Sequence, residues 1–396
     1  MNKIYIFPVK YPFTINTECF LDDEMQFISK EFDKVIIIPL KKETNTVKKI
    51  PSNCEFLNPI LPNNYRFIIN GIYCKESFRI LINDFILNNV LFDFKKLKIW
   101  IIGYLTINNL LNSKELKKIK NGLTLNDVCY FYWGKWSNIL AYFWKGKAKF
   151  ISRFHGYGDL WEEKYSEYFP IRLETIRSLD SIISISKNGT SYLINKYNCK
   201  NISTHPLGSF DNGISNKSTD NVIRIVSCSS LWPLKRVPLI LMSVKRAINL
   251  NIEWTHIGGG GSELKKLEGL AKQHSDHRLS IQIKGMIPHH KVLEYYRLNQ
   301  CDIFINLSEI EGVPVSIMEA ISFNIPVIAT DVGGTSDIVN NKTGVLVSAN
   351  PSTEEIVNAI YYVVKNYKNF TPRAFWNDNY NASKNYSYFA QMLTNL

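Results

Sequence analysis

The sequence predicts an α/β protein built from two Rossmann-like domains with a cleft between them. Its 396 residues are enough for two domains of ordinary size, each with its own core. Short apolar runs alternate with helical patterns in both halves, which is typical of parallel sheets covered by helices. A stretch rich in Gly, Asn and Ser separates the halves at residues 209–221. We therefore expect a first domain at 1–208, a linker, a second domain at 222–371 and a helical segment at 372–396.

The first domain opens as strand, helix and strand. The predicted strands are residues 3–8 and 33–40, and an amphipathic helix lies between them at residues 18–32. Such a βαβ unit predicts parallel pairing. Further along, we expect helices at 81–94 and 113–120 and an inner strand at 127–133, within a polar region that resembles an insertion.

The most informative stretch is residues 301–344. Residues 302–308 are almost wholly apolar and predict a buried parallel strand. Helix formers follow, with Pro314 suited to the first helical turn. Residues 326–332 predict another strand, which ends in two glycines. Polar residues therefore lie where a strand ends and a helix begins, and that is where open α/β sheets bind ligands, phosphate oxygens among them.

Two carboxylates eight residues apart frame this turn. Glu311 lies in the expected loop, and Glu319 lies about two turns into the helix, with the amides of Gly312 and Val313 between them. Carboxylates accept strong hydrogen bonds from vicinal hydroxyls, so the pair suits a ligand rich in hydroxyls. The alternative is a solvated helix face beside a loop acid.

The run Glu-Gly-Val-Pro-Val-Ser-Ile-Met-Glu-Ala, followed by Ile-Pro-Val-Ile-Ala-Thr-Asp-Val-Gly-Gly, resembles the E-x7-E motif of retaining glycosyltransferases of family 4. The resemblance covers most of residues 223–348, with weaker traces over 153–208. It implies the GT-B fold, with a last helix that packs back on the first domain. It also implies that Glu311 contacts the donor sugar, that Glu319 contacts the ribose, and that Gly312, Val313 and Pro314 line the donor.

Two cations, Lys235 and Arg236, lie at another expected strand-to-helix turn. Cations there can neutralise a diphosphate, each through a charge-assisted hydrogen bond worth ~1.5–3 kcal/mol. A pair of exposed charges is the alternative. The family typically has an Arg where this chain has Ser230, and we expect Arg236 to take over its charge. By resemblance, the backbone at Gly285 and Met286 contacts the nucleotide base.

His155 ends the strand expected at residues 150–155, beside two glycines and Asp159. A lone histidine is usually structural, but this segment resembles the Arg, His, Gly and Asp segment of family members that build polysaccharides, whose His approaches the donor sugar. We expect catalytic roles for Glu311, His155 and Lys235. The loop at residues 11–18 lacks the glycines that relatives place against the phosphates, so we assign it to the acceptor side.

The formal charge of +12 is concentrated between Lys95 and Lys149, where eleven Lys accompany two acids and many aromatic residues. This segment fits an anionic membrane surface or a solvated face over an aromatic core. No nucleic-acid recognition motif accompanies it, so we expect no nucleic acid. The membrane is favoured because acceptors in the family are often lipid-linked.

The resemblance therefore implies a retaining hexosyltransferase that moves sugar from a nucleoside diphosphate sugar to a glycan acceptor, lipid-linked, in bacterial capsule, O-antigen or exopolysaccharide synthesis. It also implies front-face attack, and we expect no cofactor. We expect no metal, because no carboxylate-x-carboxylate pair ends a strand. Scattered cysteines and the absence of a signal h-region favour the cytoplasm, with peripheral attachment to the inner face of the membrane. A catalytically silent relative that binds nucleotide sugar or glycan within an assembly is the alternative.

Overall fold

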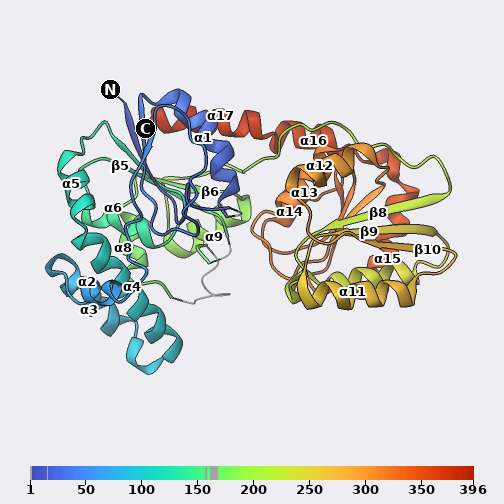
Figure 1. The fold of residues 1–396 in the computed structure, drawn as a ribbon, viewed down its shortest axis with the longest axis horizontal. Helices are drawn as coiled ribbons and strands as arrows, with labels where there is room; N and C mark the ends of the chain where they lie inside the picture. Colours follow the sequence, from blue (N-terminus) through green and yellow to red (C-terminus); the bar gives the residue numbers. More distant parts are fainter. Residues whose placement is uncertain (1, 16, 157, 161–167) are drawn as a thin grey trace. The chain divides into compact units, whose positions relative to one another are not determined.

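The chain forms two compact units in the computed structural model, which describes residues 2–15, 17–156, 158–160 and 168–396 (Figure 1). Unit 1 consists of Met1–His205 and Tyr386–Leu396, and unit 2 consists of Pro206–Asn385. The division therefore falls close to the predicted boundary at Gly208 and again inside the last helix. Within the described residues, no helix has both the length and the apolar character needed to cross a bilayer.

The described part of unit 1 contains a seven-stranded parallel sheet in the order β3-β2-β1-β4-β5-β6-β7. Its strands are β1 (Lys3–Phe7), β2 (Lys34–Ile37), β3 (Cys54–Phe56), β4 (Val128–Phe131), β5 (Lys149–Phe154), β6 (Ser181–Ser184) and β7 (Ile202–Thr204). Its helices are α1 (Cys19–Glu31), α2 (Arg66–Gly71), α3 (Lys75–Leu87), η1 (Val90–Phe92), α4 (Phe94–Asn112), α5 (Lys114–Gly122), η2 (Trp136–Ile139), α6 (Leu140–Phe143), α8 (Arg172–Arg177) and α9 (Lys187–Tyr197).

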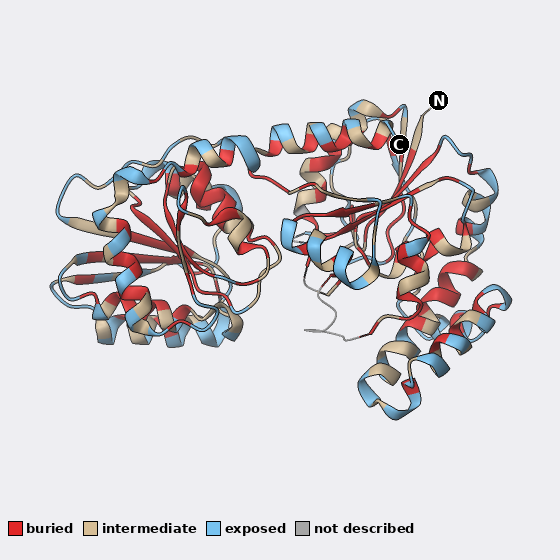
Figure 2. Cartoon of the chain, turned by 180° about the vertical axis from the view of Figure 1, so that it is seen from behind, coloured by how far each residue is buried: buried red, intermediate tan, exposed pale blue. Residues whose placement is uncertain are grey.

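Side chains alternate between the two faces of this sheet, and each face has its own apolar core. Ile4 and Ile6 of β1 pack with Met25 of α1. Phe389, near the end of the chain, belongs to the same core, so α17 (Ala382–Thr394) covers this face from Tyr386 onward. Phe7 points to the other face, which α3, α4 and α9 cover. In Figure 2 the central strands are largely buried, and the exposed residues lie mostly on helices and loops.

The helix predicted over residues 81–94 is wrong in its second half. The structure ends α3 at Leu87 and begins α4 at Phe94. Asn89 between them has φ 50°, in the left-handed region that Asn tolerates better than most residues. The carboxylate of Asp93 then accepts two backbone N–H groups as the N-cap of α4. These local stop and start signals outweigh the apolar run.

The described part of unit 2 contains a six-stranded parallel sheet in the order β10-β9-β8-β11-β12-β13. Its strands are β8 (Val222–Cys228), β9 (Asn251–Ile257), β10 (Leu279–Ile283), β11 (Ile303–Asn306), β12 (Val327–Thr330) and β13 (Gly344–Val347). Its helices are η3 (Pro233–Lys235), α10 (Val237–Arg246), α11 (Gly261–His274), α12 (His289–Leu298), α13 (Val315–Ser322), α14 (Thr335–Ile338), α15 (Thr353–Lys365), η4 (Tyr367–Asn369) and α16 (Pro372–Asn379).

The strand order of unit 2 reverses between β8 and β11. From β8 the chain proceeds outward through β9 and β10, and it then returns to the other side of β8 for β11. The loops after β8 and β11 leave adjacent strands at the carboxyl edge of the sheet, and the N–H of Glu309 in one loop donates to the carbonyl of Leu234 in the other at 2.8 Å. Such a reversal point is where open α/β sheets place their ligand-binding crevice. The two predicted strand-to-helix turns of unit 2 leave the sheet at this point.

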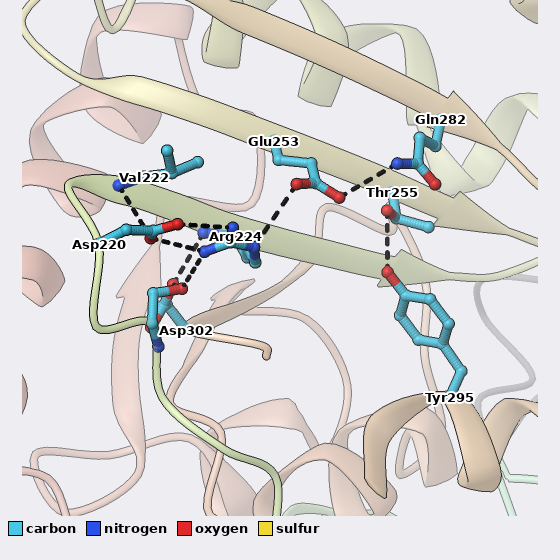
Figure 3. Close-up of polar contacts among 9 residues, drawn as sticks. Asp220, Val222, Arg224, Glu253, Thr255, Gln282, Tyr295 and Asp302 are labelled. Carbon is cyan, nitrogen blue, oxygen red and sulfur yellow. Dashed lines mark hydrogen bonds and ion pairs between the residues drawn. The ribbon is translucent and has the colours of Figure 1, made fainter. Parts of the chain in front are cut away.

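A polar network ties together the amino-terminal parts of β8 and β11, away from that crevice (Figure 3). The guanidinium of Arg224 donates hydrogen bonds to both carboxylate oxygens of Asp220, at 2.8 and 2.9 Å. The carboxylate of Asp302 accepts the backbone N–H of Arg224 at 2.8 Å and the hydroxyl of Ser218 at 2.5 Å. These contacts join the residues that precede β8 to the sheet, so this end of the sheet is structural.

Candidate functional site

The strand order of unit 2 reverses between β8 and β11, and we call this place its switch point. It holds a close ion pair between two predicted site residues. Lys235 follows β8, Glu311 follows β11, and the Lys235 Nζ lies 2.6 Å from the Glu311 Oε1. Their side chains are 22% and 12% exposed. Asn306, at the end of β11, places its amide nitrogen 3.4 Å from the same carboxylate oxygen. The fold therefore brings a cation and a carboxylate together where an α/β sheet binds its ligand.

The backbone that carries Glu311 is held by the turn after β12. Gly333 has φ 58°, and a Cβ there would collide with the carbonyl oxygen of Glu311. The next residue, Gly334, donates its N–H to the carbonyl of Gly312 at 2.7 Å. Pro314 is the N-cap of α13 and not its first helical residue, so the first turn of α13 begins beside this loop. This close packing explains the glycine at position 333.

Glu319 lies on α13, and its side chain is only 10% exposed. Its Oε1 lies 2.6 Å from the Nε2 of His289, the first residue of α12. The sequence reasoning missed His289, whose signal is a histidine pair that directly follows Pro288 at a helix start. The structure therefore provides Glu319 with a neighbouring imidazole that orients its carboxylate.

Arg236 makes contacts that differ from those of Lys235. Its Nε donates to the carbonyl of Leu307 at 2.6 Å, and its Nη2 donates to the carbonyls of Ser308 at 3.0 Å and Ala349 at 2.8 Å. Its Nη1 lies 3.2 Å from the amide oxygen of Asn350. Burial lowers the pKa of Arg236 below its ordinary value. Most of the five N–H groups of the Arg236 guanidinium thus connect the loops after β8, β11 and β13. The predicted contact of Arg236 with a diphosphate stays a prediction.

The segment predicted to meet the nucleotide base is a tight turn after β10. Gly285 has φ 60°, and its carbonyl accepts the N–H of Gly258 at 2.7 Å. Met286 is 78% exposed. The turn after β10 is therefore held against the turn after β9, and it leaves an exposed apolar side chain at the carboxyl edge of the sheet.

In unit 1, His155 directly follows β5 and packs against two aromatic rings. Its ring lies 4.7 Å from that of Tyr132 and 4.5 Å from that of Trp133, between centroids. Its Nε2 lies 2.8 Å from the carbonyl oxygen of Tyr132. Because a carbonyl only accepts, Nε2 carries the hydrogen and Nδ1 keeps a lone pair. Burial, with a smaller effect of Arg153, lowers the pKa of His155 to about 3, so its neutral form prevails at neutral pH.

The other polar residues of this segment are structural. The carboxylate of Asp159 accepts the backbone N–H groups of His155, Gly156 and Gly134 at 3.1, 2.8 and 3.1 Å. Arg153 is fully buried and forms an ion pair with the equally buried Glu24. Both contacts fix the end of β5, and they leave His155 as the residue of the segment whose Nδ1 can accept a hydrogen bond. Tyr157 lies outside the described residues.

The switch point of unit 1, between β1 and β4, is already filled by a carboxylate. Glu18 Oε1 accepts the N–H of Val9 at 2.8 Å and the indole N–H of Trp133 at 2.6 Å. Its Oε2 accepts the N–H groups of Lys10 at 2.7 Å and Tyr11 at 2.8 Å. Three successive amides form an anion-binding nest. The glycine-free first loop thus binds its own carboxylate, a role that the sequence reasoning missed.

A cavity of about 430 Å³ adjoins this filled nest. It combines three lysines, one carboxylate, two indoles and several aliphatic side chains. The lining residues are Val9, Lys10, Thr17, Glu18, Leu40, Lys41, Leu61, Ile102, Thr106, Trp133, Lys135 and Trp136. The first loop therefore lines a cavity, as it would if it shaped an acceptor pocket.

The aromatic residues between Lys95 and Lys149 lie mainly in the core. Trp144 is 2% exposed, and Trp100 stacks on Tyr104 with ring centroids 4.9 Å apart while both pack against the core. These rings therefore do not form a layer at the level of lipid headgroups. The most exposed large apolar side chains of this region lie just before the segment, at the junction of α3, η1 and α4.

No set of three His, Cys, Asp or Glu residues in the described part of the chain could together hold a metal ion. The groups available at the unit 2 switch point are instead one ammonium, two carboxylates and an imidazole. Such groups can bind a ligand that carries both phosphates and hydroxyls.

Two parallel sheets, each with helices on both faces and a switch point at its carboxyl edge, define the GT-B class of fold. Solved structures of this class match the whole chain. The structure of lipopolysaccharide outer core galactosyltransferase WaaB in its apo form gives a TM-score of 0.69 at 15% identity, and the match covers 100% of both chains. The structure of Anabaena Alr3699/HepE in complex with UDP gives 0.66 at 12% identity, again over 100% of both.

The sequence of unit 2 is similar to known glycosyltransferases. Residues 212–379 match the family model described as "Glycosyl transferases group 1". The O-antigen biosynthesis glycosyltransferase WbnH of Escherichia coli is 31% identical over 119 residues. That alignment covers 30% of this chain and 32% of the relative, so the chain spans about a third of the relative's length.

Proposed function

We propose that the chain is a retaining glycosyltransferase that transfers a hexose from a nucleoside diphosphate sugar to a glycan acceptor. The observation that carries this proposal is the pair of Lys235 and Glu311, 2.6 Å apart at the switch point of unit 2. A donor presents phosphates and vicinal hydroxyls together. The ammonium suits the phosphates and the carboxylate suits the hydroxyls, so donor binding would exchange one internal ion pair for two contacts with the ligand.

In this proposal, the residues of unit 2 hold the donor and stabilise the leaving group. Lys235 moves from Glu311 to the diphosphate, whose negative charge grows as the anomeric C–O bond breaks. Glu311 accepts hydrogen bonds from the sugar, while Glu319 accepts from the ribose and is oriented by His289. The new bond forms between the anomeric carbon and the acceptor oxygen, and the proton of that oxygen goes to a departing phosphate oxygen. No residue is bonded covalently to the sugar.

We retain the predicted role of His155 at the donor sugar, but its hydrogen bonding limits what it can do there. Its Nε2 hydrogen is engaged by the carbonyl of Tyr132, and the ring is neutral. His155 would therefore accept a hydrogen bond from a sugar hydroxyl at Nδ1 and would not act as a general acid. Gly312, Val313, Pro314, Gly285 and Met286 would line the donor, with Arg236 as a further contact for the phosphates.

We propose a UDP-sugar as donor and bacterial surface polysaccharide as the product. The structurally similar HepE was solved with UDP and with UDP-glucose. The relatives named above act in O-antigen biosynthesis and on the lipopolysaccharide outer core, which are glycans carried on lipids. These relatives support a capsule, O-antigen or exopolysaccharide acceptor that is linked to a lipid.

A lipid-linked acceptor favours a place on the inner face of the membrane, and one surface of unit 1 suits it. Leu87, Phe92 and Phe94 are 79%, 86% and 83% exposed at the tip formed by α3, η1 and α4. Lys95 and Lys98 follow directly and are exposed. Apolar side chains beside lysines complement an anionic bilayer, with ~1 kcal/mol from each well-placed lysine. We propose that this tip, at the start of the Lys95–Lys149 segment, touches the membrane.

The donor proposal is tested by thermal unfolding of the full chain with UDP-, GDP- and ADP-sugars, followed by measurement of nucleotide release. A UDP-sugar is expected to raise the melting temperature, and nucleotide release is expected when acceptor is added. Binding without release from any acceptor would favour the catalytically silent relative. If no sugar nucleotide raised the melting temperature, the site assignment would be refuted.

The membrane proposal is tested by sedimentation with vesicles of phosphatidylglycerol and phosphatidylcholine. The variant Phe92→Ser/Phe94→Ser is expected to lose at least tenfold in bound fraction while its melting temperature stays unchanged. Tyr362→Ser removes a side chain of unit 2 that is 55% exposed and serves as the matched control. Equal binding of the tip variant and the control would rule out the tip as the contact.

A further inference from the structure

The cavity at the switch point of unit 1 has a composition that indicates its ligand. Its aliphatic and aromatic walls come from Leu40, Leu61 and Ile102 together with Trp133 and Trp136. Walls of this kind take up an apolar group, since about 25 cal/mol is gained for each Å² of apolar surface removed from water. The cavity thus has room and apolar walls for a segment of a chain-like or ring-like ligand.

The charged residues of the cavity leave a net positive charge. Glu18 is engaged by four N–H donors, and Lys10 lies 3.4 Å from the carboxylate of Glu43. Neither Lys41 nor Lys135 has an ion pair or a side-chain hydrogen bond to any residue that the structure describes. Lys135 is half-buried, and burial lowers its pKa, an effect that the charge of Asp159 partly opposes. A half-buried ammonium without an acceptor is costly unless a ligand supplies the acceptor.

Trp136 gives an independent indication that this cavity is built for binding. Its φ is 59°, in the left-handed region that a bulky aromatic residue rarely adopts. Such a conformation costs on the order of 1–3 kcal/mol and persists where the surroundings hold it, which is often at ligand sites. The ring of Phe169 lies 5.9 Å away, edge to face, and holds the indole in place.

We propose that this cavity binds a phosphate group attached to an apolar chain, with Lys135 and Lys41 on the phosphate and the indole and aliphatic walls on the chain. The ligand would be the phosphorylated, lipid-linked part of the acceptor. Its identification as the acceptor rests on the proposed function. Ile102 and Thr106 of the wall belong to α4, whose first residue, Phe94, lies in the exposed apolar tip. Ile102 lies eight positions after Phe94 on this helix, a rise of about 12 Å.

The test is calorimetric titration of the full chain, without donor, with three probes: n-octyl phosphate, inorganic phosphate and n-octyl glucoside below its micelle concentration. Octyl phosphate is expected to bind at least tenfold more tightly than either of the others. Equal binding of inorganic phosphate would identify a site for free anions. Equal binding of octyl glucoside would identify an apolar site without charge recognition. Either result would overturn the proposal.

The same titration, repeated with variants, tests which lysines bind the phosphate. Lys135→Met is expected to weaken octyl phosphate at least tenfold, Lys135→Arg to restore most of the affinity, and the exposed Lys147→Met to change nothing. If Lys135→Met did not fold, Lys41→Met would take its place, with a loss of at least threefold expected. Wild-type affinity in the folded variant would refute the site. Because no donor is present, this result is independent of whether sugar transfer occurs.

Discussion

The two units place a carboxylate at the same point of their sheets but hold it in different ways. In unit 2, Glu311 at the β8/β11 switch point pairs with the flexible side chain of Lys235. In unit 1, Glu18 at the β1/β4 switch point is held by three backbone amides and an indole N–H. A ligand can displace a lysine side chain by rotation about its bonds, but it can displace Glu18 only by emptying a nest of fixed amides.

This difference teaches how one architecture can serve two purposes. In Rossmann-like sheets, the backbone N–H groups at the carboxyl end of the first strand commonly bind phosphate. Here unit 1 satisfies those amides internally and keeps an apolar, lysine-containing cavity beside them. Unit 2 keeps the ammonium of Lys235 and the carboxylate of Glu311 available to a ligand. In our proposal, donor phosphates bind at unit 2 and a different ligand binds at unit 1.

The largest expected effect comes from removing the carboxylate of unit 2. Glu311→Ala should lower the transfer rate roughly 100- to 1,000-fold, because a group that contacts the sugar while charge develops is lost. The donor affinity should change less, since Lys235 remains. Initial rates of nucleotide release measure this effect. The control is Glu309→Ala, an exposed acid of the same loop, and a rate loss of equal size there would contradict the assignment.

Removing the carboxylate of unit 1 should affect folding more than donor binding. Glu18→Ala leaves four N–H donors without their acceptor, and we expect the free energy of unfolding to fall by about 2–4 kcal/mol. Inorganic phosphate should restore part of this loss, because it can occupy the emptied nest. Urea unfolding with and without phosphate measures both effects.

The matched control for Glu18 is Glu55→Ala, which removes an exposed carboxylate of unit 1 paired with Lys34 at 2.8 Å. Surface pairs of this kind contribute little, so stability should be nearly unchanged. A Glu18 variant as stable as the Glu55 variant, and indifferent to phosphate, would show that the nest is not an anion site.

Lys235→Met should weaken the UDP-sugar about tenfold, which corresponds to the loss of one charge-assisted hydrogen bond to the diphosphate. Titration calorimetry measures the dissociation constant. Lys265→Met on α11 removes an exposed lysine without a described partner and should leave the affinity unchanged. Unaltered affinity in the Lys235 variant would mean that the ammonium serves only to hold Glu311.

A separate effect is expected in the pH dependence of stability. The pKa of His155 is about 3 in the folded chain and near 6.5 when unfolded, so the unfolded state binds more protons between these values. Stability should therefore rise with pH from about 3 to 6.5 and be complete above that. His155→Phe should lose less stability than the wild type between pH 7 and pH 5. The exposed His290→Phe should keep the wild-type slope.

Much of the fold is predictable from the sequence because apolar periodicity and strand-end glycines are local signals. The turn at Glu311 is an example, since a strand, a loop acid, a proline and a helix follow in direct succession. The motif and its resemblance indicate the loops that carry Lys235 and Glu311. Their 2.6 Å contact depends on the strand order, which places the loops after β8 and β11 side by side.

What could not be predicted depends on contacts between distant residues. Glu18 meets Trp133 across 115 positions, and Arg153 meets Glu24 across 129. No periodicity in the sequence indicates such pairs. The break between α3 and α4 was missed for another reason, because a left-handed Asn89 and a capping Asp93 interrupt an apolar run that reads as one helix. Arg153, in the segment that contains His155, is likewise a buried structural cation.

The most direct test of the account is a crystal structure of this chain with a bound UDP-sugar. We predict that the Nζ of Lys235 moves from the 2.6 Å contact with Glu311 to a phosphate oxygen, that the freed carboxylate accepts a sugar hydroxyl, and that Glu18 keeps its amide contacts. A donor bound at the Glu18 nest, with the Lys235–Glu311 pair intact, would contradict the account.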